Sequence, residues 1–208
     1  MNFPGPIFGV ATTKAFPVVA ATNTSNQSAT TTHTVDLPAS ISAGDLLVLI
    51  LIFRNNPSVT TPSGWTLLYN TNSNHAFVCF YKSASGSEGA SVDITTGASE
   101  ESAHNAYRIT GWASIESTEA SASIDPPSHT ASYGTKNTLW LAAAGNNDSG
   151  DSIGTIPSGF TNKLEIAATS NTTVGSGRKE DKVSSLNPAA WGTAGVNPHS
   201  STIAIEPG

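Results

Sequence analysis

The sequence predicts an all-β protein: an antiparallel β-sandwich, jelly-roll-like, built from two pseudo-repeated halves. Three observations support this fold class. The three-four spacing of apolar residues that marks a helix is nearly absent. Short apolar or alternating segments recur between clusters of Gly, Pro, Ser, Thr and Asn, as in sandwiches and barrels. A Pro-Ser-Gly turn that leads into an aromatic residue and a Thr occurs twice, at residues 62–66 and 157–161.

The composition is that of a folded, weakly charged protein. The chain has 208 residues, of which 38% are hydrophobic and 12% charged, with a net charge of −6. Disordered chains combine low hydrophobicity with high net charge, so this composition favours a folded domain with a sizeable core. The acidic balance argues against a nucleic-acid partner, since the basic residues of "RKEDK" at 178–182 are interleaved with acids.

The sequence also argues against a membrane partner and a cysteine-based site. The longest apolar run, residues 46–53, is far shorter than the roughly 20 residues that cross a bilayer. The first residues lack the basic and apolar regions of a secretory signal. Cys79 is the single cysteine and lies in the apolar run "HAFVCFY", so we expect a buried thiol.

Five segments read as strands. Residues 46–53 are apolar on both sides of the pleat, which predicts a central strand covered on both faces. Residues 91–98 alternate, with Val92 and Ile94 facing one way. Further strands are expected at 104–110, 137–145 and 201–207.

The two halves repeat the same order of elements, at about 33–112 and 126–207, within one domain that spans 19–208. Each half has an apolar strand, a Pro-Ser-Gly turn and an aromatic residue, for which we predict that Trp65 and Phe160 plug equivalent core positions. Burial of apolar area is worth roughly 25 cal/mol per Å², so two exposed sheet faces are expected to pack together.

Two points of this architecture stay open at the level of the sequence. The halves could form one sandwich or two successive small ones; we favour a single unit with intertwined halves. The junction at 113–130 could be a linker or a crossover that carries a strand. His104 and His199 stand at corresponding places in the two halves, which predicts a shared structural role.

The first residues, 1–18, have no counterpart in the second half and contain Pro4, Pro6 and Pro17. We predict an extended N-terminal arm that docks on a neighbouring subunit, with a frayed end as the alternative. The docking prediction rests on apolar side chains that are costly to leave in water. The predicted partner-binding residues are Phe3, Ile7, Phe8 and Val10.

No catalytic constellation is recognisable. The sequence has no G-x-S-x-G elbow, and its histidines are scattered singly without a metal-ligand spacing. Glu100 and Glu101 are expected in a turn, while Glu116 and Glu119 fall in the junction. The "NNDSGDS" segment at 146–152 resembles a calcium loop but lacks its closing acid. We therefore predict a protein that is not an enzyme, with no catalytic residue, cofactor or metal site.

Four segments resemble a recurrent pattern of small β-sandwich virion structural proteins of tailed bacteriophages. They are "ISAGDLLVLILIF", "TPSGWTLLY", "YKSASGSEGASVDITTGASEESAHNAYRITGW" and "NTLWLAAAG", which together cover roughly residues 37–145. The pattern is one of strands and turns, with no active-site motif and no binding residue to carry over.

The resemblance implies a virion structural protein on the surface of the phage particle, made in the host cytoplasm. The first expectation is a capsid decoration or cement protein that bridges shell subunits as a homo-oligomer, with a homotrimer expected. The alternative is a tail-tip, tail-fibre or head-fibre component that binds a host receptor or glycan. Its partners would be other virion proteins, either the major capsid protein or tail proteins. A free carbohydrate-binding module or enzyme domain is a third, weaker alternative.

Overall fold

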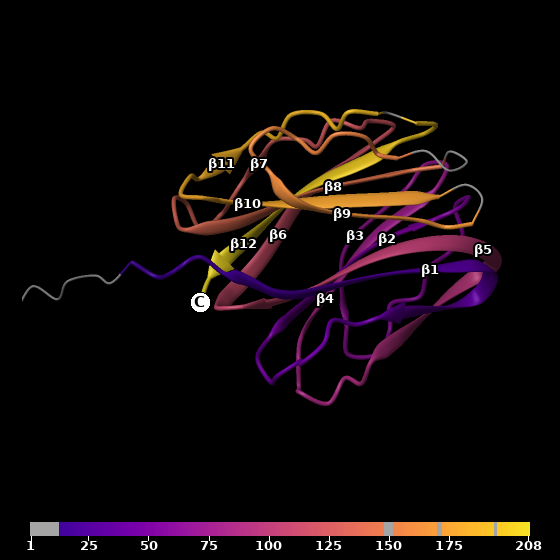
Figure 1. The fold of residues 1–208 in the computed structure, drawn as a ribbon, viewed down its shortest axis with the longest axis horizontal. Coiled ribbons are helices and arrows are strands. Elements are labelled where there is room, and N and C mark those ends of the chain that lie inside the picture. Colours follow the sequence, from indigo (N-terminus) through magenta and orange to yellow (C-terminus); the bar gives the residue numbers. More distant parts are fainter. Residues whose placement is uncertain (1–12, 148–151, 170–171, 194) are drawn as a thin grey trace, which may run out of the picture.

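The computed structural model describes residues 13–147, 152–169, 172–193 and 195–208. Within these ranges the chain is all-β, without helix, and two five-stranded antiparallel sheets pack face to face (Figure 1). The expected antiparallel β-sandwich of two pseudo-repeated halves is therefore confirmed.

Each sheet uses strands from one part of the chain. The first sheet has the order β1 (Val18–Asp36), β5 (Ser91–Thr110), β2 (Leu46–Phe53), β4 (Ala76–Ser83) and β3 (Thr66–Asn72). The second sheet has the order β6 (Trp112–Ser121), β12 (His199–Pro207), β8 (Thr138–Asn146), β10 (Thr173–Asp181) and β9 (Thr161–Ala167). A short pair, β7 (His129–Thr130) and β11 (Ser185–Leu186), completes the described strands.

The two orders match strand by strand, from β1 and β6 at one edge to β3 and β9 at the other. The halves are thus the two sheets of one sandwich, and they are stacked rather than intertwined. The first sheet draws on residues 18–110 and the second on 112–207. The expected repeat bounds of 33–112 and 126–207 leave out most of β1 and, except for Trp112, all of β6, and the junction at 113–130 carries a strand.

The two sheets are arranged as if a twofold axis that runs between them related one to the other. The edge strand β1 lies beside β9, the counterpart of β3, while β3 lies beside β6. The central strands β2 and β8 contact one another across the sandwich. Each half therefore covers the apolar face of the other.

The central strands are buried on both faces, as the apolar run at 46–53 predicts. One set of side chains from β2 and β8 enters the core between the sheets, where Val48 and Ile50 join Leu141. The other set lies beneath outer layers made of loops and strand ends. On the first sheet this outer layer includes Leu49 and Phe53, and on the second it includes Trp140. Cys79 is fully buried in the central core, as expected.

The repeated turn builds the same structure in both halves. The backbone N–H of Trp65 donates to the carbonyl of Pro62 at 3.1 Å, and that of Phe160 donates to Pro157 at 3.0 Å. Gly64 and Gly159 adopt left-handed φ values of 78° and 80°, which disfavour a side chain. The two aromatic rings are buried, each in the outer layer of its own sheet.

Strands β1 and β5 form one long, bent ladder. The sequence led us to expect separate strands with Glu100 and Glu101 in a turn between them, and this is wrong. Both acids lie within β5, because bulges between Gln27 and Thr32 keep the ladder paired through the bend. Strand β1 folds back on itself, so that the Gln27 amide donates to the carbonyl of Thr34 at 3.3 Å.

The predicted arm divides into two parts. Its apolar residues Phe3, Ile7, Phe8 and Val10 lie outside the described residues. The described residues 13–17 lead into β1, with Pro17 buried and the Lys14 carbonyl accepting a hydrogen bond of 2.7 Å from Asn137 Nδ2. Residues 13–17 extend beyond the C-terminal end of β12 (Figure 1).

Candidate functional site

All five histidines are buried, with exposed fractions from 0% to 7%. Buried imidazoles are either structural or catalytic, so their hydrogen bonds decide what chemistry they can perform. Two of them form an extended network on the outer side of the first sheet. This His33–His104 network consists of Ser25, His33, Thr96, Ser102 and His104.

Which atoms donate and which accept in this network can be deduced from the hydrogen bond at one of its ends. The hydroxyl of Thr96 donates to the carbonyl of Ala98 at 2.8 Å, so it accepts from His33 Nε2 at 3.0 Å. A neutral imidazole has one N–H and one lone pair. His33 Nδ1 therefore accepts a hydrogen bond of 2.7 Å from the hydroxyl of Ser102.

The same logic assigns the other half of the network. Because Ser102 donates to His33, its oxygen accepts from His104 Nε2 at 2.6 Å. The lone pair at His104 Nδ1 then accepts from the Ser25 hydroxyl at 3.0 Å, and Ser25 accepts from the backbone N–H of Asp36 at 3.1 Å. Every polar side-chain atom in the network has a partner, and backbone groups end it on both sides.

A serine between two imidazoles resembles a nucleophile with its base, but the environment disables that chemistry. Burial lowers the pKa of His33 to about 4, and burial together with the charge of His33 lowers the pKa of His104 to about 3. A general base works best with a pKa near the operating pH. Ser102 is fully buried, out of reach of a substrate. The network instead ties the two arms of the bent β1–β5 ladder together.

The expectation that His104 and His199 share one role is wrong. His104 belongs to the outer side of the first sheet, whereas His199 stacks near Phe77 of the central core, with ring centroids 6.1 Å apart. Side chains alternate between faces with a period of two, so a small drift in the repeat offset changes the face.

His199 pairs instead with His75 at one end of the core between the sheets. Their ring centroids are 6.2 Å apart. The hydroxyl of Thr71 donates to the carbonyl of Phe77 and accepts from His199 Nδ1 at 3.0 Å. Burial lowers the pKa of both imidazoles, and for His199 the charge of His75 lowers it further, to about 4. The pair is neutral near pH 7.

The carboxylates do not form a catalytic pair. Glu100 and Glu101 are neighbours in a strand, where successive side chains point to opposite faces. Glu100 accepts a hydrogen bond of 2.8 Å from the Asn55 amide. Glu116 accepts from the backbone N–H of Ser132 at 2.9 Å, and Glu119 is exposed on the same strand. Over the described ranges, no group of three or more histidine, cysteine or acidic residues could hold a metal ion.

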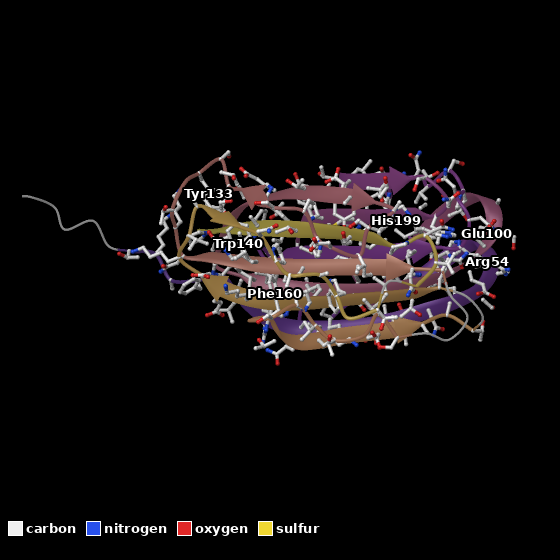
Figure 2. All side chains as sticks on the ribbon, turned by 90° about the horizontal axis from the view of Figure 1, so that it is seen from above. Arg54, Glu100, Tyr133, Trp140, Phe160 and His199 are labelled. Carbon is white, nitrogen blue, oxygen red and sulfur yellow. The ribbon has the colours of Figure 1, made fainter. Side chains whose placement is uncertain are left out.

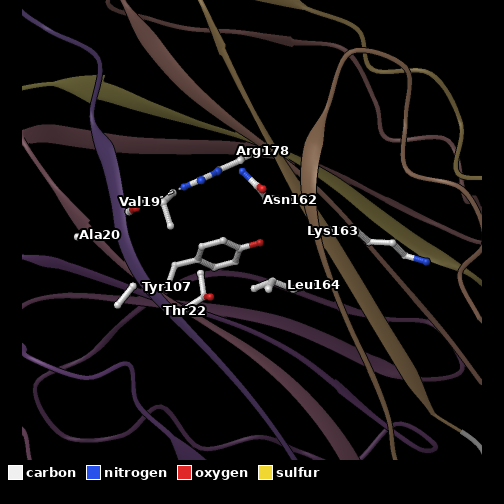
Figure 3. Close-up of a pocket in the computed structure, with 9 residues that line it drawn as sticks. Val19, Ala20, Thr22, Tyr107, Asn162, Lys163, Leu164 and Arg178 are labelled. Atoms are coloured by element: carbon white, nitrogen blue, oxygen red, sulfur yellow. Dashed lines mark hydrogen bonds between the residues drawn. The ribbon is translucent and has the colours of Figure 1, made fainter.

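A groove lies where the two sheets part, between β1 and β9 (Figure 3). This β1–β9 groove has a volume of ≈ 410 Å³. Residues 19–22 form one wall and residues 162–164 the other, with Tyr107 and Arg178 also contributing to its lining. Both walls are edge strands, each with a side that has no neighbouring strand among the described residues.

Side-chain hydrogen bonds join the two edges at both ends of the groove. Near one end, Arg178 Nη1 donates to the carbonyl of Val19 at 3.3 Å. Arg178 also donates through Nε and Nη2 to the Asn162 side-chain oxygen at 2.8 and 2.7 Å, in the amide orientation that satisfies both groups. At the other end, the Asn26 amide donates to the carbonyl of Ala167 at 2.8 Å.

Both charged side chains of the groove already have partners, which for Arg178 are neutral groups. Lys163 Nζ contacts the carbonyl of Gly154 at 2.6 Å and a carboxylate oxygen of Glu165 at 2.7 Å. The groove therefore offers strand edges and apolar side chains, including Val19 and Leu164, more than free charge. Such a surface suits an extended polypeptide better than a charged small molecule.

Sequence reasoning did not find this groove. Arg178 belongs to the mixed-charge segment 178–182, yet it is half-buried and bonded to β1. Its partner Val19 lies 159 residues away in the sequence, so no local pattern marks the contact with β1. The chain matches no family model, no curated protein and no solved structure. The described chain contains no helix with the length and apolar character needed to span a membrane.

Proposed function

We propose that this protein is a non-enzymatic structural component of a bacteriophage particle, a capsid decoration protein that bridges shell subunits. The observation that carries the proposal is the body of two packed sheets, in which all five imidazoles are buried away from solvent. Such a body suits a mechanical role. The resemblance to phage virion proteins described above is the reason to propose that this role is in a phage particle.

Polar contacts across the core support a stiff body. The Tyr107 hydroxyl lies 2.6 Å from the Ser176 hydroxyl, and the Tyr69 hydroxyl lies 2.8 Å from that of Ser201. Each contact joins one sheet to the other, and all four residues are buried. Directional bonds inside an apolar core oppose sliding of the sheets, which is a useful property in a part that must hold neighbours at fixed positions.

The arm supports attachment to a neighbouring subunit. Residues 13–17 emerge at one end of the sandwich, beside a hollow lined by Lys14, Lys136 and Lys182. These are three of the nine basic residues in an acidic protein. Lys136 is paired with Glu206. A basic end next to an apolar arm would orient the protein on an acidic surface before the arm docks.

A tail-tip or fibre component is the second candidate, and one observation favours it. At the end opposite the arm, the exposed Asn55 follows Arg54 and donates to Glu100, and the exposed Asn56 comes next in the chain. Figure 2 places Arg54, Glu100 and His199 toward this same end, away from the arm. Amide groups donate and accept hydrogen bonds, as recognition of a host glycan requires.

Copy number in purified particles distinguishes the two candidates. Quantitative mass spectrometry of virions should find the chain in amounts comparable with the shell protein if it decorates the capsid. A far smaller amount, with the protein seen at the tail in an electron microscopy map, would favour the fibre. Its absence from particles would refute both. Binding of the isolated protein to a glycan array, lost when Asn55 and Asn56 become Ala, would further support the fibre.

A further inference from the structure

We propose that the β1–β9 groove binds the N-terminal arm of a second copy of this chain, so that copies assemble by exchanging arms. This inference rests on the proposed building-block function, because it names the neighbouring subunit on which the arm docks. Its first support is that both walls of the groove are strand edges. Such edges are ready templates for another extended segment.

The direction of the two edges favours an added strand. Val19 at the start of β1 is joined through Arg178 to Asn162 at the start of β9, and Asn26 reaches Ala167 at the end of β9. The two edges therefore run in the same direction along the groove. A segment that enters the groove can lie antiparallel to one edge and pack its side chains against the other.

The groove also exposes the margin of the central core. Val19, Leu164 and Ile166 pack against that core but are only partly buried. Val18, at the start of β1, is 52% exposed. A segment with apolar side chains would remove this margin from water, at a gain of roughly 25 cal/mol per Å² of apolar surface.

The segment proposed to bind in the groove belongs to this same chain. Residues 1–12 carry Phe3, Ile7, Phe8 and Val10, which are the side chains such a margin requires. Pro4 and Pro6 lack the backbone donor of a strand, so the pairing segment is 7–10, where each residue retains its N–H. The outer faces of the two sheets are already covered by loops and strand ends, so those faces offer no site for these apolar residues.

The course of residues 13–17 indicates that the arm binds to a second copy of the chain. The described residues 13–17 run away from the sandwich at the start of β1 (Figure 1). The bond from Asn137 to the Lys14 carbonyl holds this course. The same copy's groove begins at Val19, so its own arm would have to reverse direction within a few residues. An arm that continues outward meets a neighbour instead.

An exchange of this kind has a symmetry consequence. The arm and the groove are different surfaces, so the contact is heterologous. Heterologous contacts close into rings when the rotation allows and otherwise extend as filaments. Two copies can close by reciprocal exchange of their arms, and a ring of three copies would give the expected trimer.

Cysteine crosslinking between two differently labelled chains tests the proposal. One chain carries Val10→Cys and the other Ala20→Cys, at an exposed position lining the groove. Cys79 stays in place, because it is fully buried and its pKa is raised. Mild oxidation of the mixture should give a disulfide-linked pair. The matched control replaces Ala20→Cys by Leu67→Cys, on the edge strand β3 of the same sheet, where the side chain is 44% exposed.

Three outcomes overturn the proposal. The first is equal crosslinking to Leu67→Cys and Ala20→Cys. The second is a mixture that does not crosslink. The third is a chain carrying both Val10→Cys and Ala20→Cys that closes only an intrachain disulfide, since the arm would then dock on its own body.

Light scattering after gel filtration gives an independent readout. The full chain should assemble, whereas removal of residues 1–12 should leave monomers with an unchanged circular dichroism spectrum. Ala20→Arg should weaken assembly by about tenfold or more in Kd, or about 1.4 kcal/mol, while Leu67→Arg should not. An assembly that survives both the deletion and Ala20→Arg would refute arm exchange. Arm-exchanged oligomers that are missing from virions would refute the proposed function alone.

Discussion

The hydroxyl of Tyr107 in β5 lies 2.6 Å from the hydroxyl of Ser176 in β10, across the apolar core between the two sheets. The Ser176 oxygen also accepts a hydrogen bond of 2.8 Å from the Asn105 amide. Tyr69 in β3 and Ser201 in β12 form a second such contact, at 2.8 Å. Each sheet thus supplies tyrosines or serines that fix its position relative to the other.

We expect Tyr107→Phe to lower the free energy of unfolding by about 0.5–1.5 kcal/mol, since it removes one hydrogen bond and leaves the ring in place. Urea denaturation of Tyr107→Phe, Ser176→Ala and the double variant measures their coupling. A coupling energy near zero would show that the two hydroxyls do not stabilise the sandwich.

We expect Trp65→Ala and Phe160→Ala each to cost about 3–5 kcal/mol of stability, because both remove a buried ring and leave a cavity. Their exposed fractions are 9% and 6%. Leu67→Ala is the control for an exposed apolar residue, with an expected change within about 0.5 kcal/mol. If one aromatic variant behaves like the control, the two turns are not energetically equivalent.

Ser102→Ala should destabilise the protein by about 1–3 kcal/mol or more, because it leaves both His33 Nδ1 and His104 Nε2 without a partner inside the protein. The matched control is Ser87→Ala, at an exposed serine. Hydrogen exchange of the β1–β5 ladder gives a local readout, and protection should fall there first. Unchanged protection around the bend would show that the network does not hold it.

Stability should fall as the pH drops below about 6.5. Burial sets the pKa of His33 and His199 to about 4 and that of His104 to about 3, against an ordinary value of 6.5. The unfolded chain therefore binds protons more readily than the folded one in this window. Each of these histidines should cost about 1–2 kcal/mol between roughly pH 7 and pH 5.

The carboxylates affect the stability of the protein at lower pH than the histidines do. Hydrogen bonds from Ser85 and its neighbours outweigh desolvation and lower the pKa of Glu88 to about 2, so its contribution is lost only below about pH 4.5. Imidazole proton shifts followed by NMR separate the two effects. Signals of His33, His104 or His199 that titrate near pH 6.5 in the folded protein would contradict the first window.

Part of the fold could be predicted from local patterns. Alternation and apolar runs depend only on neighbouring residues, so they marked the covered central strand at 46–53 and the exposed and buried sides of 91–98. The repeated turn likewise marked Trp65 and Phe160, since glycine with a left-handed φ is required just before each ring. The same patterns failed at Glu100, where a bulge continues the strand through what looked like a turn.

The sequence by itself determined that this chain is all-β, that it has two corresponding halves, and which aromatic residues close each turn. Only the tertiary structure decided that each half is one sheet, that His104 and His199 face different layers, and that β1 and β9 leave a groove between them. The reason is physical. Strand patterns depend on a few neighbouring residues. By contrast, the contacts of His33 with Ser102 and Thr96, of Arg178 with Val19 and of Tyr107 with Ser176 join residues 63 to 159 positions apart, which meet only in the folded protein.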